Sequence, residues 1–96
     1  MSRRVTFKLR LFVADNAPNS AQAIANLDAF RLTHAPDCCE IEIVDVFREP
    51  KRALADGIFM TPTLVVLSPL PVRRIVGTLS HAPTLLLALG VEVLAA

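Results

Sequence analysis

The sequence predicts an α/β fold with a four-stranded mixed sheet and the element order β-α-β-α-β-β-α. Three observations lead to this prediction. Residues 5–13 and 40–46 each alternate apolar with polar side chains, as strands with one buried face do. The segment between them has apolar residues at helical spacing. A Thr-Pro step at Thr61-Pro62 then opens a short apolar run that is typical of a strand buried on both faces.

The first helix should begin just after a turn-forming stretch. Asn19 or Ser20 should cap it, because the side chains of these residue types accept hydrogen bonds from the first N–H groups of a helix. Gln22 stands three residues after Asn19, as in a capping box. Pro36 disfavours helical geometry in the residue before it, so the helix should end near His34.

The two alternating segments should pair in parallel, because a helix connects them. Lys8 and Arg10 on the first strand would then lie beside Glu40 and Glu42 on the second, and opposite charges would face each other. An alternative use of Lys8 and Arg10 is contact with a partner protein.

The second half of the chain should contain a short helix, two strands and a last helix. Pro50 suits the first position of a helix and Gly57 its end, so residues 50–56 should be helical. Ile58 and Phe59 should then fold back towards the core. We expect strands at 62–67 and 72–77, joined as a hairpin, and a helix from Thr84 to Leu94.

Pro62 should stand at the entry of its strand, where a missing N–H is tolerated and a cis peptide can be accommodated. In thioredoxin-like folds a Thr-Pro or similar step begins the strand that faces the loop before the first helix. The element order and this step together predict a thioredoxin-like fold.

Composition limits the class of protein. The chain has 96 residues, which is the size of a single domain (1–96), and a formal net charge of +1 with neither Trp nor Tyr, so nothing indicates a nucleic-acid partner. Hydrophobic residues make up 53% and the mean hydropathy is +0.50, which favours an interface with a partner or a homo-oligomer, a dimer or tetramer.

We expect a cytoplasmic protein without a membrane span. After Arg3 and Arg4, the charges of Lys8 and Arg10 interrupt the apolar core that a secretory signal would need. The apolar run near the end is shorter than the ~20 residues that a spanning helix requires.

The residues that carry chemistry are sparse. The adjacent Cys38 and Cys39 match no redox or zinc spacing, and the loop before the first helix contains no cysteine. His34 and His81 stand alone, so we expect no metal and no cofactor. The sequence therefore favours a binding module over an enzyme; a thioredoxin-like redox protein that uses Cys38 or Cys39 is the remote alternative.

Several stretches resemble one family at its usual spacing. They are 9–14 (LRLFVA), 18–20 (PNS), 44–46 (VDV), Pro50, 61–64 (TPTL), 71–77 (PVRRIVG) and 79–80 (LS). The chain resembles the KaiB family of cyanobacterial clock proteins and their bacterial relatives. The resemblance implies a non-enzymatic regulator that binds a KaiC-type hexameric ATPase, with a KaiA-like protein or a histidine kinase as further partners. It also implies a metamorphic protein, in which a thioredoxin-like form binds the ATPase and a ground-state form with a rearranged C-terminal half is a homotetramer.

Two sets of residues are candidates for these roles. Basic residues would contact an acidic face of a partner, and prolines and their neighbours in the C-terminal half would take part in a fold switch. Thr78 stands where an acidic residue is usual in the family. Alternatives outside a true clock are a stress-response module and a sensor module of the histidine-kinase type. The partner-binding candidates are Lys8, Arg10, Lys51, Arg52, Arg73 and Arg74, and the fold-switch candidates are Pro62, Pro69, Pro71, Gly77 and Thr78.

Overall fold

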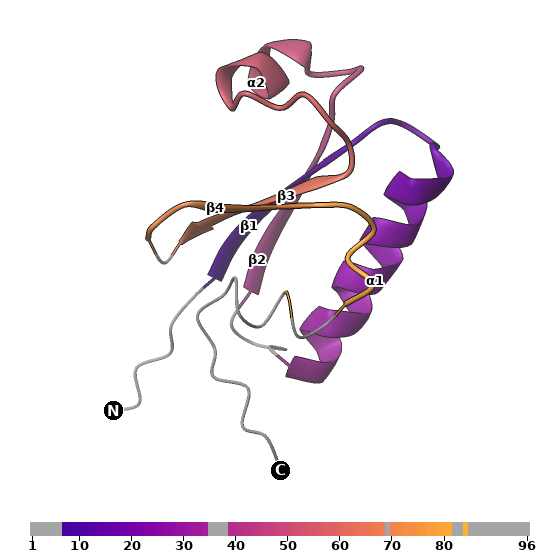
Figure 1. The fold of residues 1–96 in the computed structure, drawn as a ribbon, viewed down its shortest axis with the longest axis vertical. Coiled ribbons are helices and arrows are strands. Elements are labelled where there is room, and N and C mark those ends of the chain that lie inside the picture. Colours follow the sequence, from indigo (N-terminus) through magenta and orange to yellow (C-terminus); the bar gives the residue numbers. More distant parts are fainter. Residues whose placement is uncertain (1–6, 35–38, 69, 82–83, 85–96) are drawn as a thin grey trace.

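A four-stranded mixed sheet forms the centre of the molecule (Figure 1). The structure is a computed structural model that describes residues 7–34, 39–68, 70–81 and 84. β1 pairs in parallel with β2 and antiparallel with β3, and β3 pairs antiparallel with β4. The predicted α/β class, the mixed sheet and both predicted pairings are confirmed. In the spatial order of the sheet, the strands are β2 (Cys39–Asp45), β1 (Phe7–Val13), β3 (Thr63–Ser68) and β4 (Arg73–Val76).

Two helices accompany the sheet. The long helix α1 (Pro18–His34) runs along one face, and the short helix α2 (Pro50–Ala55) lies beyond one end of the strands (Figure 1). Glu49 precedes α2 without a side-chain capping hydrogen bond, and Gly57 follows it with a φ of +66°. The predicted last helix, from Thr84 to Leu94, lies outside the described residues apart from Thr84.

The predicted cap of α1 is wrong. The helix already begins at Pro18, because proline has no N–H to lose at a first helical position. Ser20 is instead buried inside the first turn, where its Oγ accepts a hydrogen bond of 3.0 Å from the backbone N–H of Ala14. Ser20 therefore ties the start of the β1–α1 loop to the first turn of α1 and does not cap the helix.

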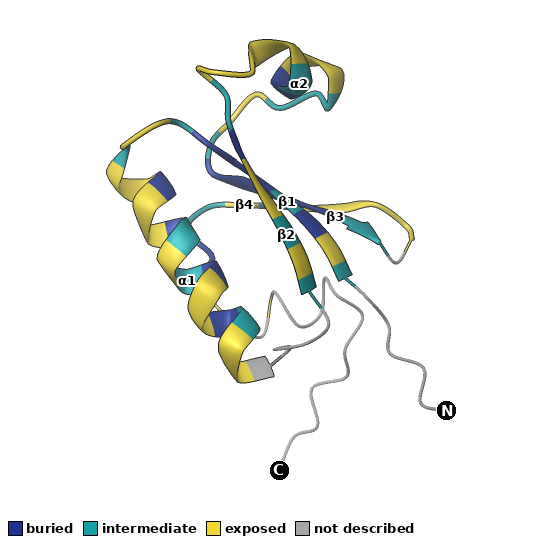
Figure 2. Ribbon diagram, turned by 180° about the vertical axis from the view of Figure 1, so that it is seen from behind, coloured by how far each residue is buried: buried dark blue, intermediate teal, exposed yellow. Residues whose placement is uncertain are grey.

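The strict alternation of β1 divides the core into two clusters. Leu9, Leu11 and Val13 face α1 and pack with its buried residues, among them Leu27. Phe12 faces the opposite side and packs with residues from β2, β3 and α2. Figure 2 shows the buried residues gathered along the central strands and on the inner side of α1.

The segments around β3 and β4 have special backbone geometry. The Thr61–Pro62 and Leu70–Pro71 peptides are cis, and Pro62 stands one residue before β3, at the predicted entry of the strand. Gly77 follows β4 with a φ of +121°, and its N–H donates a 2.9 Å hydrogen bond to the carbonyl of Pro62. Gly77 thus ties the end of β4 to the entry of β3.

We expect Ser20→Ala to destabilise the protein by about 1–3 kcal/mol, because the partly buried N–H of Ala14 would lose its acceptor. Urea denaturation measures the change. Asn19→Ala is the matched control, since Asn19 is exposed on the same helical turn and should cost far less. Equal effects of the two substitutions would contradict the role given to Ser20.

Candidate partner-binding surface

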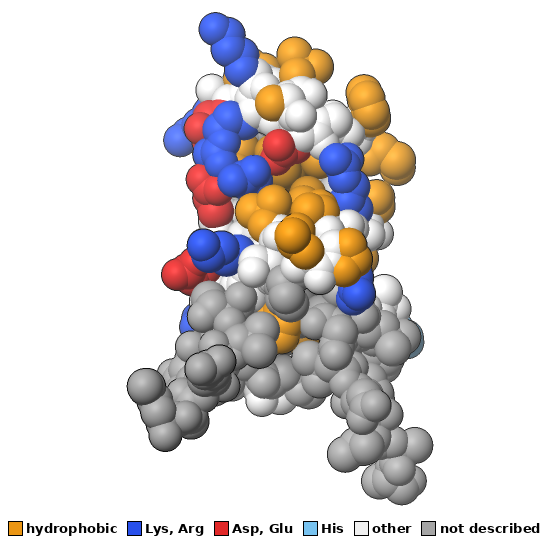
Figure 3. Space-filling model, turned by 90° about the vertical axis from the view of Figure 1, so that its left-hand side faces the viewer, with side chains coloured by type: hydrophobic (Ala, Val, Ile, Leu, Met, Phe, Trp, Pro, Cys, Tyr) orange, Lys and Arg blue, Asp and Glu red, His pale blue; other side chains and the backbone are white. Residues whose placement is uncertain are grey.

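The described residues cover the face of the sheet opposite α1 only in part. Among the described residues, α2 packs against one end of this face through Ala53, while the rest carries charged and apolar side chains (Figure 3). The alternation of side chains along each strand and the register between strands determine which residues lie on this face. We call this surface, together with α2, the open face; its sheet residues are Lys8, Arg10, Glu40, Glu42, Val65, Leu67, Arg74 and Val76.

A cluster of ion pairs connects the open face to α2. Arg10 Nε donates to Glu42 Oε1 over 2.9 Å, and Arg10 Nη1 donates to Asp56 Oδ2 over 2.8 Å. Arg52 Nη2 reaches the same Glu42 oxygen at 2.7 Å, and its Nη1 lies 3.4 Å from Glu49 Oε1. The cluster therefore links β1, β2 and both ends of α2. The predicted pairing of Arg10 with Glu42 is confirmed, and Lys8 aligns with Glu40 in the same register.

The ion pairs shift the ionisation of their members. The guanidinium groups of Arg52 and then Arg10 lower the pKa of Glu42 from 4.5 to about 2, because they hydrogen-bond its charged form. Hydrogen bonds to Asp56 and then Glu42 raise the pKa of Arg10, and the hydrogen bond to Glu42 raises that of Arg52. All three groups are thus fixed in their charged forms near neutral pH.

Arg73 and Arg74 belong to opposite faces of β4. Arg74 aligns with Val65 of the open face, whereas Arg73 aligns with Val66, which faces α1. Arg74 Nη1 donates to the carbonyl of Gly57 at 3.0 Å, and its Nη2 donates to the carbonyl of Asp56. The guanidinium of Arg74 therefore binds the backbone just after α2 and joins β4 to it.

Exposed apolar side chains surround α2. Phe47, Leu54, Phe59 and Met60 are all exposed, Phe59 to 91%. The prediction that Phe59 folds back towards the core is wrong, since Ile58 takes that place and the next side chain points outward. The sequence analysis did not predict that these apolar side chains form an exposed patch. Large apolar residues placed close to a short, highly charged helix could have indicated it.

The described cysteine and histidine residues do not form a catalytic or metal-binding site. Cys39 begins β2, at the end of the sheet remote from the start of α1, and Cys38 and the side chain of His34 lie outside the described residues. His81 Nδ1 lies 2.7 Å from Thr84 Oγ1. Within the part of the chain that the structure describes, no three His, Cys, Asp or Glu side chains could hold a metal ion, and no helix is long and apolar enough to cross a membrane.

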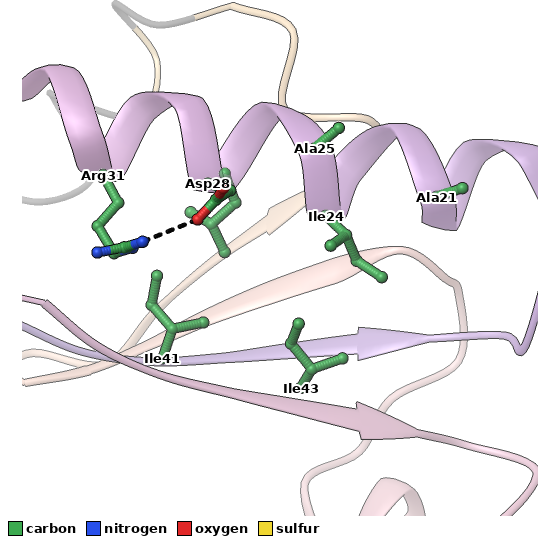
Figure 4. Close-up of a pocket in the computed structure, with 8 residues that line it drawn as sticks. Ala21, Ile24, Ala25, Asp28, Arg31, Ile41 and Ile43 are labelled. Carbon is green, nitrogen blue, oxygen red and sulfur yellow. Dashed lines mark hydrogen bonds and ion pairs between the residues drawn. The ribbon is translucent and has the colours of Figure 1, made fainter.

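A second surface feature is a groove of about 380 Å³ between α1 and the edge strand β2 (Figure 4). Ile24 points from the helix towards Ile41 and Ile43, and a 2.9 Å ion pair joins Arg31 to Asp28 at one end. Asp28 and Arg31 are the charged residues among the described lining of the groove, and they pair with each other. The groove is therefore an apolar gap between helix and sheet edge, without a set of groups for catalysis.

The lowered pKa of Glu42 makes one contribution to stability depend on pH. The contribution is present above about 4.5 and is lost as pH falls towards about 2, because Glu42 must then take up a proton and release its arginines. We expect Glu42→Gln to lower stability modestly at neutral pH, and the difference from wild type to shrink through this pH range. Urea denaturation at several pH values measures this.

Glu40→Gln is the matched control for this experiment, since Glu40 lies on the same strand and the same face. Its substitution removes no ion pair of the cluster and should lower stability at neutral pH less than Glu42→Gln does. A constant difference between wild type and Glu42→Gln across the acid range would contradict the ion cluster.

Comparisons with known proteins agree with this architecture. Residues 10–91 match the KaiB domain family. A circadian clock oscillator protein KaiB from Synechococcus elongatus is 40% identical over 89 residues, which cover 93% of this chain and 87% of the relative. The N-terminal domain of Synechococcus elongatus SasA has a similar fold, with a TM-score of 0.71 and 20% identity over 94% of this chain and 89% of that one. Chloroplastic thioredoxin z gives a TM-score of 0.73 and 16% identity over 94% and 95% of the two chains, so the predicted thioredoxin-like fold is confirmed. The extent and identity of the sequence match decide the family: the chain belongs to the KaiB family.

Proposed function

We propose that this protein is a non-enzymatic, cytoplasmic regulator of the clock type that binds a KaiC-type hexameric ATPase through the open face and α2. One observation carries the proposal. The exposed apolar side chains around α2 stand next to basic residues that the ion cluster holds in place. A rigid surface that combines apolar and charged groups suits protein recognition. The KaiB relatives are named circadian clock oscillator proteins, and this supports a regulator of the clock type.

The candidate basic residues divide into two groups in this proposal. Arg10 and Arg52 hold α2 against the sheet, so they act on binding by positioning the helix. Lys51 is exposed on α2 and Arg74 on β4, where each offers a charge to an acidic partner. Lys8 lies further along the open face and belongs with the second group, whereas Arg73 lies on the α1 side of β4 and is not part of this surface.

The proposal includes a fold switch of the C-terminal half, with a homotetramer as the second state. Pro62, Pro71, Gly77 and Thr78 border β3 and β4, and Pro69 lies outside the described residues. In this fold Asn26 Nδ2 donates a 2.8 Å hydrogen bond to the carbonyl of Thr78, and the next residue, Leu79, is buried against the α1 cluster. These contacts belong to the binding form and would be exchanged in the other form.

Gly77→Ala should disfavour the binding form. The φ of Gly77, +121°, is a backbone angle that residues with a side chain rarely adopt. We therefore expect the substitution to destabilise the binding form by about 1–3 kcal/mol, although the space around Gly77 is open. Analytical ultracentrifugation measures the resulting shift of the monomer–tetramer balance towards the other form. Gly57→Ala is no suitable control, because Gly57 has a positive φ as well. Ala29→Gly, at an exposed position of α1, perturbs the backbone outside the C-terminal half and is the matched control. An unchanged distribution in Gly77→Ala would sink the role of Gly77.

Binding to the ATPase tests the proposed function as a whole. We expect light scattering to show the chain joining a KaiC-type hexamer in the presence of nucleotide, with a tetramer dissociating as monomers bind the ring. Lys51→Glu on α2 should weaken binding, because it reverses a charge on the proposed surface, whereas Arg31→Glu on α1 should not.

The same experiment separates the alternatives. No association with the ATPase would contradict the proposed partner. Association with a histidine kinase or a KaiA-like protein in its place would favour a sensor or stress-response module of the same family.

A further inference from the structure

A small groove on the open face lies between β4 and the segment that follows α2. It has a volume of about 160 Å³. We call it the Arg74 groove; the residues that form it include Gly57, Phe59, Met60, Thr63, Arg74 and Val76. Met60 accepts a 2.6 Å hydrogen bond from Thr63 Oγ1 through its carbonyl, and this contact holds the loop beside the strand. The groove is therefore formed by anchored backbone on both sides.

The cation in this groove keeps an uncompensated charge. Arg74 donates to two neutral backbone carbonyls, those of Asp56 and Gly57. The nearby carboxylate of Asp56 is bound by Arg10 at 2.8 Å. Among the described residues, no carboxylate lines the groove. Arg74 is thus held in position by bonds that leave its positive charge available, and carboxylates are the groups that guanidinium recognises best.

The remaining walls of the groove are apolar and exposed. Phe59 is exposed to 91%, Met60 to 63% and Val76 to 53%. Exposed neighbouring apolar side chains favour an interaction site, because their burial in a complex is favourable. Figure 3 shows that the charges are distributed unevenly over this side of the molecule. Acidic and basic side chains are mixed along one margin, whereas basic side chains lie beside hydrophobic ones along the other.

We propose that the Arg74 groove binds a short acidic and apolar peptide segment of a partner protein, with a carboxylate on Arg74 and an apolar side chain against Phe59, Met60 and Val76. A second copy of the chain is a poorer occupant, because it would bring its own Arg74 to the same groove and the two positive charges would repel each other. The proposal rests on the proposed role as a protein-binding regulator, but it does not depend on the ATPase as the partner.

Three capped heptapeptides test the proposal with the full chain. The first alternates glutamate with leucine, the second alternates glutamine with leucine, and the third alternates glutamate with serine. We expect the first to bind and to shift the amide signals of Gly57, Met60 and Val76 in an NMR titration. The second and third each lack one of the two recognised features, so each should bind about tenfold more weakly.

Substitutions assign the two features to the groove. Arg74→Gln should weaken the first peptide about tenfold, and Arg74→Lys, which keeps the charge, should weaken it less. Phe59→Ala should also weaken binding, and it leaves the core untouched because Phe59 is almost fully exposed. Arg31→Gln and Leu32→Ala on α1 are the matched controls and should bind as wild type does.

Each outcome decides the proposal. Equal binding of the three peptides, or shifts confined to α1, would overturn the groove as a site for acidic peptides. If the ATPase binds the chain and no peptide does, the groove is wrong while the proposed function stands. If the first peptide binds as described and the ATPase does not, the groove is supported and the proposed partner fails.

Discussion

The structure depends on the alternation of side chains along β1, the strand that contacts both β2 and β3. Leu9, Leu11 and Val13 all face α1, so one helix can bury the centre of one face of the sheet. The intervening positions must then face the other way, and only Phe12 among them is fully buried. Among the described residues, only α2 packs on the opposite side, at one end of the strands. The open face follows from this arrangement, and it is the surface that we propose for a partner.

A second constraint follows, because α2 is too short to be stable alone. A helix of this length gains little from its own hydrogen bonds and depends on tertiary contacts. Ala53 supplies the apolar contact, Arg10 and Arg52 attach the helix to the sheet, and Arg74 binds the carbonyls just after it. The charges that looked like partner contacts in the sequence are therefore in part structural. Arg10 and Arg52 position α2, and only Arg74 combines a structural contact with the recognition role that we propose.

The sequence predicted the fold well because its strongest signals are local. Each of these patterns predicts the backbone conformation of the segment in which it occurs. They are the alternation in β1 and β2, the Pro50 and Gly57 that bound α2, and the Thr61–Pro62 step before β3. Ser20 was misread, because its acceptor role depends on the approach of Ala14, which a helix-capping rule does not contain. The family was also recognisable from the motifs, and the comparisons agree.

The candidate surface was only partly predictable. Pairing of Arg10 with Glu42 followed from strand order, but the link to Asp56 joins residues far apart in the chain and requires the tertiary fold. Phe59 was expected inside, because hydrophobicity alone does not tell which of two adjacent apolar residues points outward. The faces of Arg73 and Arg74 were settled by the register of β3 with β4, which no single strand encodes.

The central claim is that this chain recognises its partner with the open face. Amide hydrogen exchange, measured with and without a KaiC-type hexamer and nucleotide, tests it most directly. The account predicts new protection in residues 47–60 and 73–76, with the outer side of α1 exchanging as before. Protection confined to α1, with those two segments unchanged, would contradict it.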